Sequence, residues 1–177
     1  LPRMAGTEER RWALRSSATN EDMERASAAG LYRTVLGVGQ ARLADAITDI
    51  WASAWDERVL HYMLASGNAE VAPAMAIVIQ PLLNVAVAGV ATSIHPVTGR
   101  DRHVTINAVR GLGQLLVDGS VSPDQYVVET TAGQPARVIR RIVGQQRERL
   151  VLTAAALAME PVPAGERDRP MLSDQQL

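Results

Sequence analysis

The strongest constraint on the fold is a change of hydrophobic period on either side of Pro73. Before it, apolar residues recur with the spacing of one face of a helix, which predicts one long amphipathic helix over residues 40–65, ended by Ser66-Gly67-Asn68. After it, short apolar runs separated by turn residues are typical of strands. We therefore expect an α+β fold with mostly antiparallel sheets and one long helix. The face expected to be buried comprises Leu43, Ile47, Ile50, Trp51 and Ala54.

The predicted strands fall into two groups. Residues 75–80, 85–94 and 103–109 are expected to share one sheet that packs against the helix, and the continuous apolar run 75–80 is typical of a strand buried on both faces. A terminal antiparallel meander is expected to follow. The strands of this meander are predicted at 126–129, 137–143 and 147–152. Two further strands are predicted near the start of the chain, at 12–14 and 32–38.

Composition excludes several classes of function. The chain of 177 residues has no cysteine, so disulfides, thiolate zinc sites and cysteine nucleophiles are excluded. All 18 basic residues are arginines, which excludes lysine chemistry within the chain. A net charge of −1 and an aromatic content of 3% give no reason to propose nucleic-acid binding. No apolar run is long enough to span a membrane, and we expect a cytoplasmic protein.

Three short segments contain residues that can bind a ligand, and each also has a purely structural interpretation. Arg15, with Ser16 and Ser17, is expected where a strand meets a polar loop, and it can bind phosphate oxygens or pair with Glu21 or Asp22. The turn Gly111–Gln114 can present backbone amides to an anion, or simply connect a strand to a helix. The run Gln80-Pro81-Leu82-Leu83 can offer backbone groups to adenine, or belong to the core.

Metal-binding patterns are not evident. His61, His95 and His103 lack the spacing of metal ligands, and no Asp-x-Asp array for magnesium is present. Residues 160–170 combine prolines, a glycine and charges, so we expect an exposed linker there. Ser173 and Gln176 form a capping-box pattern that opens a helix, and we expect the chain to be a piece of a longer polypeptide.

An ordered set of motifs resembles one family. Over residues 12–170 the chain is similar to the N-terminal ATP-grasp nucleotide-binding domain of phosphoenolpyruvate synthase, pyruvate phosphate dikinase and rifampin phosphotransferase. The matching motifs are Arg15-Ser-Ser-Ala-Thr-Asn-Glu-Asp22, Ala26-Ser-Ala-Ala-Gly30, Thr34-Val-Leu-Gly-Val38, Ala76-Ile-Val-Ile-Gln80, Gly89-Val-Ala-Thr92, His95-Pro-Val-Thr-Gly99, Gly111-Leu-Gly113, Val117-Asp-Gly119 and Pro123-Asp-Gln-Tyr126.

The resemblance implies the residues that bind ATP. It implies that Arg15 contacts the terminal phosphates and that Thr34 lies on the phosphate side of a cleft between two lobes. Gln114 stands where the family usually has a glutamate that holds the ribose, so an amide replaces a charge there. The resemblance also implies an adenine hinge made by Gln80, Pro81 and Leu82.

The reaction implied by the resemblance needs parts outside this chain. A phosphoryl group passes from ATP to a histidine on a separate swivelling domain, and then to pyruvate or to an antibiotic hydroxyl. The family's nucleotide lysine lies upstream, and its Mg²⁺ ligands lie downstream of Leu177. We therefore expect residues 1–159 to be the central part of the nucleotide-binding domain and residues 160–177 to be a linker and the start of a truncated helix. The isolated chain is expected to be inactive.

Two alternatives remain open at the level of sequence. The first is the nucleotide domain of an antibiotic phosphotransferase, which differs only in the acceptor. The second is a non-catalytic nucleotide-binding or scaffold module, which the replacement at Gln114 keeps open.

Overall fold

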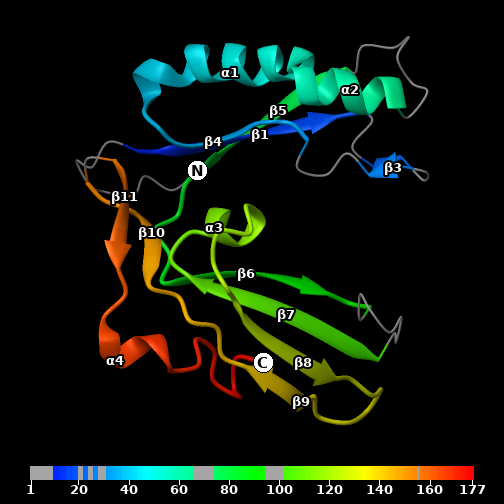
Figure 1. Ribbon diagram of the computed structural model, residues 1–177, viewed down its shortest axis with the longest axis vertical. Helices are drawn as coiled ribbons and strands as arrows, with labels where there is room; N and C mark the ends of the chain where they lie inside the picture. The colour runs from blue at the N-terminus through cyan, green and yellow to red at the C-terminus, as the bar shows by residue number, and fades with distance from the viewer. Residues whose placement is uncertain are drawn as a thin grey trace. The chain divides into compact units, whose positions relative to one another are not determined.

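The computed structural model contains two compact units, Leu1–Leu83 and Asn84–Leu177 (Figure 1). It describes residues 10–19, 22–23, 26–27, 31–65, 74–94, 102–154 and 156–177. The α+β class with antiparallel strand pairs is confirmed. The single sheet predicted to hold residues 75–80, 85–94 and 103–109 is wrong, because the first of these strands belongs to one unit and the other two to the second.

The first unit is built on a three-stranded sheet in the order β4-β1-β5. The central strand β1 (Trp12–Ala18) pairs antiparallel with β4 (Thr34–Val38) and with β5 (Met75–Pro81). The regular register with β5 extends over the whole of β1, so this strand continues four residues beyond the predicted end at residue 14. A separate two-stranded ladder joins β2 (Asp22–Met23) to β3 (Ala26–Ser27).

The helical segment of the first unit is not one continuous helix. It comprises α1 (Leu43–Ala52) and α2 (Glu57–Ala65), with the short 3-10 helices η1 (Gln40–Arg42) and η2 (Ser53–Trp55). The buried Ser53 hydroxyl donates to the carbonyl of Ile50 at 2.6 Å, and Asp56 then adopts an extended backbone with ψ 144°. Serine and aspartate favour such local bonds at helix ends, which the apolar spacing does not reveal. The predicted end at residues 66–68 lies outside the described residues.

One face of the three-stranded sheet packs against the helices, which lie on the same side of it in Figure 1. Leu14 and Val38 from the sheet meet Ala46 and Ile50 from α1, and all four are buried. Trp51 departs from the prediction, because 53% of it is exposed, and its indole N–H donates to the carbonyl of Met75 at 3.1 Å. A second cluster, under α2, contains Tyr32, Ala54, Val59 and Met63.

We expect Ile50→Val to lower the free energy of unfolding by about 0.5–1.5 kcal/mol, because Ile50 is fully buried and loses one methylene group. Denaturation followed by tryptophan fluorescence measures this, since all three tryptophans belong to the first unit. Leu64→Ala is the matched control: Leu64 is 67% exposed, and its loss is expected to stay within about 0.5 kcal/mol. Equal losses for the two variants would contradict the assignment of the packed face.

The second unit contains a four-stranded antiparallel meander and a two-stranded ladder. The meander follows the chain order, and the short helix α3 (Gln114–Val117) is inserted after its second strand. The strand predicted at 147–152 is found over residues 148–152, but its place in the meander is wrong, because its ladder is with the strand that follows it. The meander comprises β6 (Val87–Thr92), β7 (His103–Arg110), β8 (Asp124–Glu129) and β9 (Arg137–Ile142), and the ladder comprises β10 (Glu148–Leu152) and β11 (Leu157–Pro161).

The sequence predicts an exposed linker over residues 160–170, and the structure differs there. Its first two residues belong to β11, and Val162 is fully buried, with its N–H donating to the carbonyl of Arg147 at 2.8 Å. The short helix α4 (Ala164–Arg167) follows. Prolines and charges made the segment look like a linker, whereas the pairing of its backbone and the burial of one valine anchor it to the second unit. The wider division into residues 1–159 and 160–177 stays a prediction.

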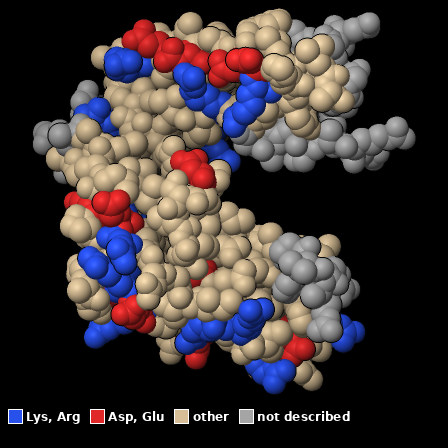
Figure 2. Space-filling view, viewed as in Figure 1, with Lys and Arg blue, Asp and Glu red and all other residues tan. Residues whose placement is uncertain are grey.

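Charged side chains of both signs are interspersed on the face of the molecule in Figure 2. Among the described residues on this face, no extended basic area is visible. Within the described part of the chain, every helix is too short or too polar to serve as a membrane span.

Candidate functional site

Three of the predicted site residues share the open face of the three-stranded sheet. Successive side chains of a strand point to opposite faces, and Leu14 points toward α1, so Arg15 points away from the helices. Arg15 lies opposite Thr34 on β4 and opposite Val78 on β5, while Gln80 lies opposite Ala13. Arg15, Thr34 and Gln80 are all exposed. The strand register therefore brings them to one solvent-accessible surface.

Arg15 and Thr34 are close cross-strand neighbours. The Leu82 N–H donates to the carbonyl of Arg11 at 2.9 Å, and this register directs the backbone groups of Arg15 toward β5. Arg15 and Thr34 are therefore a non-hydrogen-bonded pair, the type in which side chains approach most closely. A guanidinium beside a hydroxyl supplies donors that suit phosphate oxygens.

The surroundings of Arg15 differ in part from the prediction. Arg15 lies within β1 and not at the start of a loop. Ser17 shares its face, whereas Ser16 points to the opposite face and cannot add its hydroxyl to the same ligand. The side chains of Glu21 and Asp22, the alternative partners, lie outside the described residues.

The predicted adenine hinge lies at the end of an edge strand. Within the described residues β5 is hydrogen-bonded on one side only, to β1. The register directs the backbone groups of Gln80 and Leu82 toward β1, so the free edge presents the carbonyl of Pro81 and the N–H of Leu83. This carbonyl and N–H match the acceptor and donor that an adenine edge requires. The sequence indicated the segment, and only the register shows which of its groups are available.

Gln114 belongs to the second unit, whereas the other predicted site residues belong to the first. It begins α3 directly after the turn that follows β7. Gly111 has φ +76°, and a Cβ there would collide with the carbonyl oxygen of Leu150, so the turn requires glycine at this position. Because α3 has only four residues, the interpretation of the turn as an anion site at a helix N-terminus has no support.

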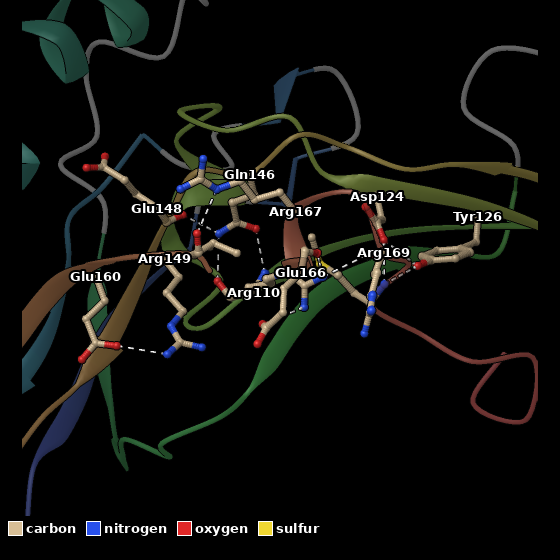
Figure 3. A network of polar contacts seen from close by, with 12 residues as sticks. Arg110, Asp124, Tyr126, Gln146, Glu148, Arg149, Glu160, Glu166, Arg167 and Arg169 are labelled. Carbon is tan, nitrogen blue, oxygen red and sulfur yellow. Dashed lines mark hydrogen bonds and ion pairs between the residues drawn. The ribbon is translucent and has the colours of Figure 1, made fainter. Parts of the chain in front are cut away.

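A buried carboxylate in the second unit was not singled out as a site by the sequence. Asp124 is fully buried and accepts hydrogen bonds from the Tyr126 hydroxyl at 2.7 Å and from the N–H groups of Gly144 and Met171, each at 2.8 Å (Figure 3). Burial, followed by the bond to Asp124, raises the pKa of the Tyr126 hydroxyl above its ordinary value. The signal in the sequence is an aspartate and a tyrosine two residues apart, on the same face of one strand.

The described residues contain no group of three or more His, Asp or Glu side chains arranged to hold a metal ion. His61 lies 3.6 Å from the carboxylate of Glu57 on the surface of α2, and His103 begins β7. His95 lies outside the described residues.

Comparison with known proteins agrees with the motif pattern. Residues 2–177 match the model of the family described as pyruvate phosphate dikinase, AMP/ATP-binding domain. The phosphoenolpyruvate synthase of Aeropyrum pernix is 40% identical over 129 residues, which cover 72% of this chain and 16% of that protein. The rifampicin phosphotransferase of Streptomyces sviceus is 36% identical over 166 residues, which cover 93% of this chain and 19% of that protein.

A third relative also matches most of this chain. A probable phosphoenolpyruvate synthase of Methanothermobacter thermautotrophicus is 32% identical over 93% of this chain and 24% of its own length. The matched region thus spans between 16% and 24% of the length of these relatives. The resemblance predicted from the motifs is confirmed, and the chain belongs to the family of pyruvate phosphate dikinase AMP/ATP-binding domains.

Proposed function

We propose that this chain is the ATP-binding part of a phosphotransferase of the phosphoenolpyruvate synthase type, with an ATP-grasp fold. In the parent protein, a phosphoryl group passes from ATP to a histidine on another domain and then to pyruvate. The observation that carries the proposal is the shared open face of Arg15, Thr34 and Gln80, in a chain whose family binds AMP or ATP. A cytoplasmic location is part of the proposal.

Each site residue has a role that follows from its chemistry. The Arg15 guanidinium binds the terminal phosphates and stabilises the charge that develops on the transferred group, while the Thr34 hydroxyl donates to the same oxygens. The free edge of β5 binds adenine through the carbonyl of Pro81 and the N–H of Leu83. Gln114 binds a ribose hydroxyl through its amide. Transfer then depends on positioning and on electrostatic stabilisation.

Magnesium, when bound to ATP, neutralises phosphate charge. The described residues contain no group of three His, Asp or Glu side chains placed to hold a metal ion, and from the family resemblance we propose that the magnesium ligands lie in other parts of the parent protein. The residues of this chain act on the nucleotide without them: they bind the base, the ribose and the phosphates. The histidine that accepts the phosphoryl group is likewise proposed to belong to another domain.

A second candidate is an antibiotic phosphotransferase of the rifampicin type. It is favoured by the match to the Streptomyces sviceus relative, which covers 93% of this chain. The proposed roles in this chain are the same for both candidates, because only the final acceptor differs. A non-catalytic nucleotide-binding module is the remaining alternative, and the amide of Gln114 in place of a carboxylate is compatible with it.

The test uses the full-length parent protein with Mg²⁺ and ATP radiolabelled in its phosphates. We expect an acid-labile, base-stable phosphoprotein, as histidine phosphorylation gives, and discharge of its label to added pyruvate. Discharge to a rifamycin and not to pyruvate would support the second candidate. ATP binding without a labelled protein would support the non-catalytic module, and failure to bind ATP would contradict all three.

A further inference from the structure

The last residue of β7 lies beyond the end of its pairing with β8. The β7–β8 pairing ends at Ala108 and Asp124, and Pro123, which has no N–H, precedes β8. The Gly111 N–H donates to the carbonyl of Ala86 on the β6 side at 2.8 Å. Neighbouring residues in a strand direct their backbone groups to opposite sides, so the N–H and carbonyl of Arg110 point toward β8, where no strand residue pairs with them.

The side chain of Gln146 takes the place of the missing strand (Figure 3). Its Oε1 accepts from the Arg110 N–H at 2.8 Å, and its Nε2 donates to the Arg110 carbonyl at 3.0 Å and to the Glu148 carbonyl at 2.8 Å. A primary amide carries the same acceptor and donor as a peptide group. Gln146 is 1% exposed, so bonds lost here are not replaced by bulk water.

This contact fixes the start of the turn that ends at Gln114. After Arg110, the Gly111 N–H is held by Ala86, and the Leu112 N–H donates to the carbonyl of Leu150 at 2.8 Å. Three successive backbone positions are thus held before α3 begins at Gln114. We expect a shift of Arg110 to move this turn and with it the side chain of Gln114.

We propose that Gln146 is a positioning residue for nucleotide binding: its amide replaces a strand beside Arg110 and so holds Gln114 where it contacts the ribose. This inference rests on the proposed function, because it takes Gln114 to be the ribose contact. Gln146 itself does not touch the nucleotide.

The test is a comparison of nucleotides by calorimetric titration of the full-length parent protein. Wild type is expected to bind ATP about two- to tenfold more tightly than 2′-deoxyATP or 3′-deoxyATP, the range for one hydrogen bond. Gln146→Met keeps the approximate size of the side chain and removes its hydrogen bonds, and we expect the preference for ATP to fall to about one. If Gln146 had a purely structural role, its replacement would weaken the binding of all three nucleotides equally and leave the preference for ATP unchanged.

Two further variants test whether Gln146 affects the nucleotide preference through the position of Gln114. In a Gln114→Ala background, Gln146→Met is expected to change the preference no further. Gln125→Met is the matched control, because Gln125 bonds through its side chain to the side chain of Asn107 at 3.3 Å and not to the turn. It is expected to keep the wild-type preference. Faster exchange of the Arg110 amide in Gln146→Met is the expected structural signature.

The outcomes separate this inference from the proposed function. A wild type that does not bind ATP overturns both. A wild type that binds ATP without preferring the ribose hydroxyls overturns the inference and the ribose role of Gln114, but not ATP binding by the chain. A folded Gln146→Met that keeps the preference overturns the inference alone. If Gln146→Met does not fold, Gln146→Asn replaces it, because its amide is one methylene too short to reach Arg110 and Glu148 together. The same loss of preference is expected, and its retention overturns the inference.

Discussion

Replacement of Arg15 by alanine in the full-length parent protein is expected to lower the turnover number by about 10²- to 10³-fold. The reason is that Arg15, beside Thr34 on the open sheet face, is proposed to stabilise charge on the transferred phosphate. An interaction that strengthens in the transition state affects turnover more than the Michaelis constant, so KM for ATP is expected to change much less. Steady-state kinetics on the folded variant measures both constants.

The controls for Arg15 distinguish charge, geometry and folding. Arg15→Lys is expected to rescue poorly, because an ammonium keeps the charge and loses the planar fork of donors. Arg42→Ala is the matched control, since Arg42 is an exposed arginine of the same unit that lies 3.2 Å from Asp45 in the helical layer. It is expected to leave turnover unchanged. Early melting of both Arg15 variants, together with normal turnover when folded, would make Arg15 a structural residue and contradict the assigned role.

Asp124→Ala is expected to lower the free energy of unfolding of the second unit by about 3 kcal/mol or more. The substitution leaves the buried Tyr126 hydroxyl and the Gly144 N–H without their acceptor, while the Met171 N–H keeps only its bond to the Tyr126 hydroxyl oxygen at 3.0 Å. Chemical denaturation followed by circular dichroism measures the loss. Asp118→Ala is the control, because Asp118 is exposed, and its effect is expected to be within about 0.5 kcal/mol. A comparable loss in both variants would contradict the role of the buried carboxylate.

The same cluster predicts a sensitivity to alkaline pH. Burial raises the pKa of Tyr126 in the folded state, and in the unfolded chain it returns to about 10. A raised folded pKa gives stability that is fully present below the unfolded pKa and is lost as pH rises through the folded value. The second unit is therefore expected to lose stability above about pH 10, and Tyr126→Phe is expected to reduce this dependence.

Local patterns in the sequence predicted the class of fold and many of its elements. The strand over residues 103–109 depends on alternation and is found, and the turn Gly111–Gln114 does connect a strand to a helix. The break between α1 and α2 was missed because it depends on a buried serine hydroxyl bound to a carbonyl, which has no apolar signature. The pairing of strands could not be predicted from local patterns either. β10 pairs with β11, and nothing in the sequence of either strand excludes pairing with β9.

For the candidate site too, some features could be predicted from the sequence and others could not. The motif order indicated Arg15, Thr34 and Gln80, and all three are exposed on one sheet face. Alternation along the strand shows that Ser17 shares the face of Arg15 and that Ser16 does not. This argument is available only once the strand is known to continue past Arg15. The sequence gives no indication of the role of Gln146, because its partner Arg110 lies 36 residues earlier in the chain. The contact also takes the place of a strand that is absent beside Arg110, which no local pattern reveals.

The irregular segment between β9 and β10 has a consequence for how the chain tolerates changes in length. Gly144, Gln146 and Arg147 each bond a different partner, so one inserted residue would shift all these bonds out of register, although no helix or strand is interrupted. The hairpin between β8 and β9 is the opposite case, because residues 131–136 are exposed throughout. Tags, probes and natural insertions are therefore expected to be accommodated in that hairpin and excluded from residues 143–147.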